Sequence, residues 1–180
     1  MRTLSSVDQV LALLESGGGE AYFGEPVTVL EHSLQAAWFV QRQGAASALI
    51  AAALLHDLGH LLHTEGEDVA VRGVDTQHEA LGVNALGDHL PASVLDPIRL
   101  HVAAKRFAEP AYLAALSPAS QQSLALQGGP MSAAKSEGFL ALAHARQTIT
   151  LRRADDTAKI SNPKVPTLDA YRELIQDLWH

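Results

Sequence analysis

The residue pair best suited to bind a metal or take part in catalysis is His56-Asp57. It lies at the end of a stretch rich in alanine and leucine. Residues 45–58 are apolar nearly all round, which predicts a central buried helix ended by Gly59. A carboxylate at the end of such a helix is costly to bury unless it is paired or bound to a metal. A solvated aspartate at an ordinary helix end is the alternative. The pair is therefore a candidate for two metal ligands.

Two further candidate ligands lie far from this pair in the sequence. His32 falls inside an amphipathic helix predicted from Val27 to about Arg42. Asp155 falls in a long helix predicted over residues 137–158, where Asp156 is its rival. A histidine, a His-Asp pair and a distant aspartate form the H…HD…D pattern of the HD-domain superfamily, so these residues predict one metal site.

His78 and His101 could supply a second metal, because they lie between the pair and the last aspartate. Asp57 would then bridge two ions. For either histidine alone, a surface or helix-capping position is an open alternative. The chain has no cysteine, so any metal must bind nitrogen and oxygen. Imidazole and carboxylate ligands suit iron, manganese or magnesium.

Composition limits the class of protein. The 180 residues, 47% of them hydrophobic, suffice for one domain that spans 1–180. The formal net charge of -7 argues against nucleic acid as a partner. The most apolar stretch, residues 45–55, is too short to cross a bilayer, and no signal peptide is recognisable. We expect a soluble, cytoplasmic protein without a membrane partner.

The elements that must position these residues are all predicted to be helical. Apolar residues recur at helical spacing, and no convincing pair of strands is found. The polar stretch from His63 to Gln77 is predicted to be a loop that leads to His78. The remaining predicted helices cover residues 6–14, 78–89, 91–107, short turns within 108–131, and 171–179. The fold class is therefore predicted as all-α.

Several segments resemble a specific branch of the HD superfamily. They lie at residues 22–25, 30–35, 54–60, 77–79, 101–106 and 127–131. HDLGH is common to many HD proteins, but HVAAKR followed by QGGPM is far more restrictive. The sequence thus resembles the 2-amino-1-hydroxyethylphosphonate dioxygenase family of mixed-valent diiron oxygenases, and more distantly myo-inositol oxygenase.

This resemblance implies a helical HD-domain bundle with two iron ions, Fe(II)/Fe(III), in its core. One iron would be held by His32, His56, Asp57 and Asp155, and the other by Asp57, His78 and His101. Asp155 is preferred to Asp156 because Arg152 then lies three residues earlier on the same helix face, as in the family.

The resemblance also implies residues that handle the substrate. Tyr22 and Glu25 would form a lid in which Tyr22 caps the second iron and Glu25 accepts a substrate ammonium. A turn with an exposed glutamate is the alternative. Lys105 lies one turn after His101, which favours a phosphonate contact over a solvated lysine. The other expected phosphonate contacts are His60, Ser123, Gln127 and Arg152, with Ser120 as the alternative to Ser123.

The implied reaction is O2-dependent cleavage of the C–P bond of (R)-2-amino-1-hydroxyethylphosphonate to glycine and phosphate. Glu25 suits a primary ammonium, whereas the trimethylammonium analogue would prefer an aromatic surface such as Tyr22, Phe23 or Trp38. Two alternative hypotheses for the function are an HD phosphohydrolase and a ligand-binding HD module without activity. Dependence on O2 and ferrous iron would separate the oxygenase from the hydrolase.

Overall fold

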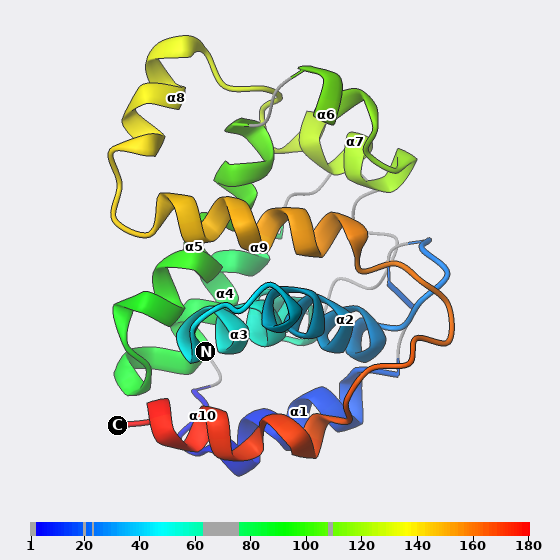
Figure 1. Cartoon of the computed structure of the whole chain (residues 1–180), viewed down its shortest axis with the longest axis vertical. Helices are drawn as coiled ribbons and strands as arrows, with labels where there is room; N and C mark the ends of the chain where they lie inside the picture. Colours follow the sequence, from blue (N-terminus) through cyan, green and yellow to red (C-terminus); the bar gives the residue numbers. More distant parts are fainter. Residues whose placement is uncertain (1–2, 20, 23, 63–75, 108–109) are drawn as a thin grey trace.

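In a computed structural model, the chain is described at residues 3–19, 21–22, 24–62, 76–107 and 110–180. Within these ranges the secondary structure is helical, apart from one isolated bridge between Ala21 and Thr28 (Figure 1). The all-α prediction is confirmed. Most of the predicted loop before His78, residues 63–75, lies outside the described residues, as does Phe23.

Five helices form the centre of the molecule. α5 lies along α9, α2 packs against α3 and α9, and α3 and α4 both contact α5 (Figure 1). Their bounds are α2 Val29–Arg42, α3 Ser47–Leu55, α4 His78–Leu86, α5 Ala92–Phe107 and α9 Ala145–Thr157. Each contributes, or directly precedes, one of the predicted metal ligands.

The remaining helices cover this centre on two opposite sides. α1 and α10 lie together at one end of the view in Figure 1, and α6, α7 and α8 lie at the other. Their bounds are α1 Val7–Gly17, α6 Pro110–Ala114, α7 Pro118–Leu126, α8 Ala133–Leu140 and α10 Arg172–Leu178. One cluster of buried apolar side chains extends from Leu4 to Ile175. Among the described residues, no helix combines the length and apolar character that crossing a bilayer requires.

Local sequence explains where α2 and α3 begin and what they bury. Thr28 accepts a hydrogen bond from the backbone of Glu31, whose side chain accepts one from the backbone of Thr28, so α2 starts at a capping box. α3 is apolar on every side, and seven of its residues, from Leu49 to Leu55, are buried. The end of α3 is therefore delivered to the interior.

The prediction that α3 continues to Leu58 and stops at Gly59 is wrong. α3 ends at Leu55, Asp57 has φ -101° and ψ 10°, and a 3₁₀ turn follows over Leu58–Leu61. Gly59 lies inside that turn, where an added Cβ would come within 1.9 Å of the carbonyl oxygen of His78. Glycine is required here for close contact with the start of α4, and not to end a helix.

The single helix predicted over residues 137–158 is also wrong. α8 ends at Leu140 and α9 begins at Ala145, with His144 in the left-handed region at φ 61°. The intervening alanine and leucine residues are good helix formers, so the sequence gives no local signal to stop. Phe139 and Ala145 pack into one buried cluster on α5, which supports the change in chain direction.

Candidate metal centre

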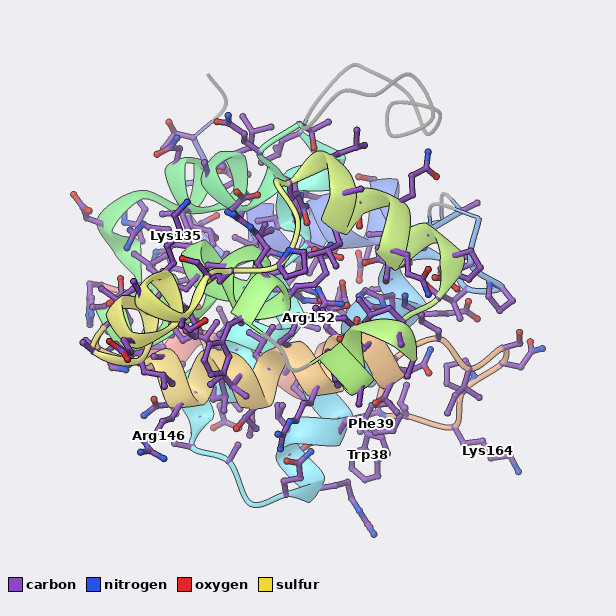
Figure 2. All side chains as sticks on the ribbon, turned by 90° about the horizontal axis from the view of Figure 1, so that it is seen from above. Trp38, Phe39, Lys135, Arg146, Arg152 and Lys164 are labelled. Atoms are coloured by element: carbon purple, nitrogen blue, oxygen red, sulfur yellow. The ribbon has the colours of Figure 1, made fainter. Side chains whose placement is uncertain are left out.

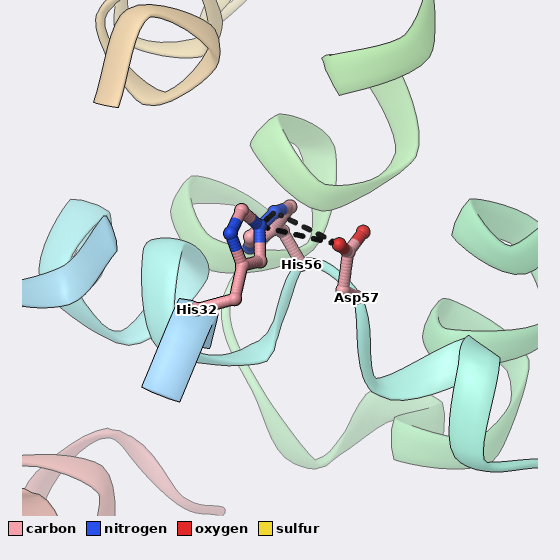
Figure 3. Close-up of side chains that lie close together, drawn as sticks. All are labelled: His32, His56 and Asp57. Carbon is pink, nitrogen blue, oxygen red and sulfur yellow. Dashed lines mark hydrogen bonds and ion pairs between the residues drawn. The ribbon is translucent and has the colours of Figure 1, made fainter. Parts of the chain in front are cut away.

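Three predicted ligands meet in the interior at the end of α3. Figure 3 shows the rings of His32, from α2, and His56 converging on the carboxylate of Asp57. The two Nε2 atoms are 3.3 Å apart, and each lies 3.4 Å from Oδ2 of Asp57. All three residues are buried. Together they form a group of side chains that could hold a metal ion.

Backbone carbonyls fix the orientation of these two histidines. Nδ1 of His32 lies 2.8 Å from the carbonyl oxygen of Ala158, and Nδ1 of His56 lies 2.8 Å from that of Ala53. When each Nδ1–H donates to its carbonyl, each neutral imidazole directs its Nε2 lone pair into the shared space. Two facing lone pairs repel unless a cation lies between them. This arrangement fits a metal ion.

The carboxylate of Asp155 lies beside this first group, and that of Asp156 forms other contacts. Oδ1 of Asp155 lies 3.5 Å from Nε2 of His32, and Oδ2 lies 3.6 Å from Nε2 of His56. Within the described residues, the buried Oδ1 atom has no hydrogen-bond partner, as expected of an oxygen that faces a cation site. Asp156 instead accepts hydrogen bonds from Arg152 and Tyr112.

A second group of ligands uses the other oxygen of Asp57. Oδ1 of Asp57 lies 3.4 Å from Nε2 of His78 and 3.6 Å from Nε2 of His101. These two nitrogens are 2.9 Å apart, and Nδ1 of His101 lies 2.7 Å from the carbonyl oxygen of Ile98. Asp57 thus presents one oxygen to each pair of histidines, which is the geometry that a bridging carboxylate needs.

The electrostatics of the two groups differ. Burial lowers the pKa of His56, but the negative charges of Asp57 and Asp155 outweigh burial and raise it to about 9, so a metal ion that binds its Nε2 has to displace a proton. Burial and the nearby His56 lower the pKa of His101 to about 3, so this imidazole is neutral and can bind a metal without losing a proton. Burial raises the pKa of Asp57, but His56 and His32 bring it well below its usual range. Asp57 is therefore a carboxylate, ready to bind metal.

Tyr22 closes one side of the first group. Its hydroxyl donates a hydrogen bond of 2.6 Å to Oδ2 of Asp57, and its ring stacks on His32 with centroids 4.0 Å apart. Burial and the charge of Asp57 raise the pKa of Tyr22, so the hydroxyl keeps its proton. The structure therefore places Tyr22 beside the His32 and His56 pair, whereas the family resemblance implies a cap on the other ion.

Two buried cations border the site. Lys105 Nζ donates to Oγ of Ser123 at 2.8 Å, and burial together with Arg152 lowers the pKa of Lys105 to about 7. Arg152 contacts Oδ2 of Asp155 at 2.5 Å and also pairs with Asp156. Figure 2 shows Arg152 near the centre of the molecule, while Lys135, Arg146 and Lys164 lie towards the edge.

The chain is similar to known proteins over most of its length. The HD-domain family model matches residues 29–137, which include five of the six predicted ligands and more than half of the chain. The chain belongs to the HD-domain family. The matched segment ends before Asp155, so the last residue predicted for the H…HD…D pattern lies beyond it, on α9.

Two curated relatives place this HD protein among the phosphonate dioxygenases. The glycine-betaine-forming 1-hydroxy-2-(trimethylamino)ethylphosphonate dioxygenase of Leisingera caerulea is 36% identical over 177 residues, which cover 97% of this chain and 85% of the relative. Hydroxymethylphosphonate dioxygenase of Gimesia maris is 40% identical over 162 residues, which cover 88% and 81%. Membership of the phosphonate-cleaving HD oxygenase branch follows.

Of the other predicted contacts of this HD protein, His60 lies at the same centre and Ser123 lies beside Lys105. His60 stacks on His78 with centroids 3.9 Å apart, and its Nε2 lies 3.8 Å from Oδ1 of Asp57. The side-chain oxygen of Gln127 is buried and has no hydrogen-bond partner among the described residues. Ser123 accepts from Lys105, whereas Ser120 accepts from Lys159, so the two alternatives contact different cations.

Three polar residues of this HD site were not predicted from the sequence. Lys159 and Ser117 both contact Glu25, and Tyr112 contacts Asp156. The one available signal for Lys159 was its position four residues after Asp155, just past the end of α9. Ser117 is the cap of α7 and has the ordinary signature of a helix start, followed by Pro118.

Proposed function

We propose that this chain catalyses O2-dependent cleavage of the C–P bond of a 1-hydroxyphosphonate, giving a carboxylate and inorganic phosphate. The observation that carries this proposal is the pair of buried ligand groups that share Asp57. The reaction balances with one O2 per substrate, because both oxygen atoms enter the products. No external reductant is consumed in a turnover.

The proposed cofactor is a pair of iron ions in the Fe(II)/Fe(III) state. Six nitrogen and oxygen ligands, without sulfur, support this choice. When bound, the irons would supply the redox chemistry that activates O2 and would coordinate the substrate hydroxyl. The proposed ligands are His32, His56, Asp57 and Asp155 for one ion, and Asp57, His78 and His101 for the other.

The protein's own cations would bind the phosphonate group. Lys105 is only 4% exposed and its ammonium contacts a serine hydroxyl, and no carboxylate among the described residues forms an ion pair with it. A dianion that enters beside Lys105 would favour its charged form and form a charge-assisted hydrogen bond. Arg152, Ser123, His60 and Gln127 are the other proposed contacts.

Tyr22 would change position when the substrate enters the site. Its hydroxyl is hydrogen-bonded to Asp57, so a substrate that approaches the first ion has to displace this contact. Its position over His32 also shields that ligand from water. We therefore propose that Tyr22 orders the site before the substrate binds and moves when it arrives.

Three substrates fit the proposed reaction. Glu25 is the basis for (R)-2-amino-1-hydroxyethylphosphonate, which would give glycine. The named activities of the two relatives supply the trimethylammonio analogue, which would give glycine betaine, and hydroxymethylphosphonate, which would give formate.

The test is to load the protein anaerobically with ferrous iron, oxidise it partially, and supply each substrate with and without O2. We expect phosphate and the matching carboxylate only when O2 is present. Release of phosphate from a nucleotide without O2, and no turnover of any hydroxyphosphonate, would contradict the proposal and favour the phosphohydrolase.

A further inference from the structure

The carboxylate of Glu25 already binds an ammonium group from the protein itself. Nζ of Lys159 lies 2.8 Å from Oε1 of Glu25, 3.1 Å from Oγ of Ser117 and 2.9 Å from Oγ of Ser120. A lysine ammonium has three N–H donors, and each of them has an acceptor here. Lys159 therefore occupies a complete ammonium-binding site.

The ion pair is largely shielded from water. The side chains of Lys159 and Glu25 are only 13% and 11% exposed. Ser117 donates a hydrogen bond of 2.5 Å to the same Glu25 oxygen, so this acceptor is bound twice. Breaking such a pair leaves a partly buried charge without its partner, which is costly.

Lys159 is held close to the metal centre by its neighbour in the chain. The carbonyl oxygen of Ala158 lies 2.8 Å from Nδ1 of His32, so the residue before Lys159 is bonded to a proposed ligand. Glu25 belongs to the segment whose Tyr22 hydroxyl reaches Asp57. The ion pair therefore joins two segments that both border the proposed substrate site.

A substrate ammonium would meet two obstacles at Glu25. It would have to displace Lys159 from its three acceptors. It would also approach the positive charges of Lys159 and Lys105, which contact Ser120 and Ser123 of the same helix, α7. A hydroxyphosphonate without an ammonium group meets neither obstacle. Its dianionic phosphonate is instead attracted to the same cations.

We propose that Lys159 is a specificity-determining residue, which reserves Glu25 for itself and directs the site towards hydroxyphosphonates without an ammonium group. Hydroxymethylphosphonate is the smallest such substrate. This inference rests on the proposed C–P cleavage. It replaces the preference for the amino substrate that Glu25 alone suggests.

The experiment compares kcat/KM for hydroxymethylphosphonate with that for (R)-2-amino-1-hydroxyethylphosphonate in the iron-loaded protein. We expect the wild-type protein to favour hydroxymethylphosphonate. Lys159→Met and Lys159→Gln free the carboxylate, so each should shift the ratio towards the amino substrate by about tenfold or more. Lys164→Met is the matched control, because Lys164 is exposed and points away from the molecule (Figure 2).

A double variant shows whether the gain passes through Glu25. In E25Q/K159M no carboxylate remains for a substrate ammonium, so the gain of K159M should be lost. A merely structural role for Lys159 would instead lower kcat/KM for both substrates by the same factor.

The outcomes separate the inference from the function on which it rests. A wild-type preference for the amino substrate, which requires no variant to fold, would overturn the role of Lys159 alone. So would an unchanged ratio in both Lys159 variants. Failure of the wild-type protein to cleave any hydroxyphosphonate with O2 would overturn the proposed function and this inference with it.

Discussion

The carbonyl oxygen of His78 lies where a side chain on Gly59 would have to be, only 1.9 Å from the position of an added Cβ. This close approach brings the start of α4 against the 3₁₀ turn that follows Asp57. It thereby sets His78 within reach of the second oxygen of Asp57. Gly59, which is not itself a predicted ligand, thus determines whether the second group of ligands can form.

Gly59→Ala is expected to push α4 away from Asp57. The backbone clash should destabilise the protein by about 1–3 kcal/mol and cost it the metal held by His78 and His101. Metal analysis and thermal unfolding measure both effects. Gly138→Ala in α8 is the matched control, because an added Cβ there meets nothing within 4 Å and should leave both quantities nearly unchanged. Full metal content in G59A would refute the role given to this glycine.

Asp57→Ala is expected to remove both ions, because each group of ligands uses one oxygen of this carboxylate. Asp155→Ala should remove only the ion held by His32 and His56. Metal content per chain distinguishes the two results, and exposed Asp169→Ala provides the control. Retention of one ion by D57A would show that Asp57 does not bridge.

Asp156→Ala tests the alternative to Asp155 directly. Asp156 accepts hydrogen bonds from Arg152 and Tyr112, so its loss should let Arg152 move without removing a ligand. We expect kcat/KM for the phosphonate to fall about tenfold with both ions retained. A loss of metal in D156A would instead identify Asp156 as the ligand.

Most of the side chains that meet at the candidate site were predicted from the sequence, partly from physical patterns and partly from the family resemblance. Helical periodicity places His32 and His101 on defined helices, and a buried carboxylate such as Asp57 needs a charged partner. The helix break before Ala145 could not be predicted from the sequence, because alanine and leucine favour a helix there. Tertiary packing determines where the helix ends. The pairing of Lys159 with Glu25 was equally hidden, because it joins residues 134 positions apart.

Lys105→Met is expected to stabilise the metal-free protein and to impair catalysis. Folding lowers the pKa of Lys105 from 10.5 to about 7, so this residue costs increasing stability as pH falls from about 10 to about 7. The gain in free energy of unfolding from K105M should therefore increase as pH falls from about 10 to about 7, towards a few kcal/mol.

For the metal-loaded K105M protein, we expect kcat/KM for the phosphonate to fall about a hundredfold, since a charge-assisted contact is lost. Unfolding measured at several pH values checks the expected gain in stability, and steady-state kinetics check the expected loss of activity. A K105M protein that is less stable at pH 7 but fully active would contradict both.

The most direct test of the account is the ratio of O2 consumed to phosphate released by the iron-loaded protein with a hydroxyphosphonate. We expect one O2 per phosphate, no phosphate without O2, and no turnover in D57A. Phosphate release at an unchanged rate without O2 would contradict it and indicate hydrolysis at the same metal centre.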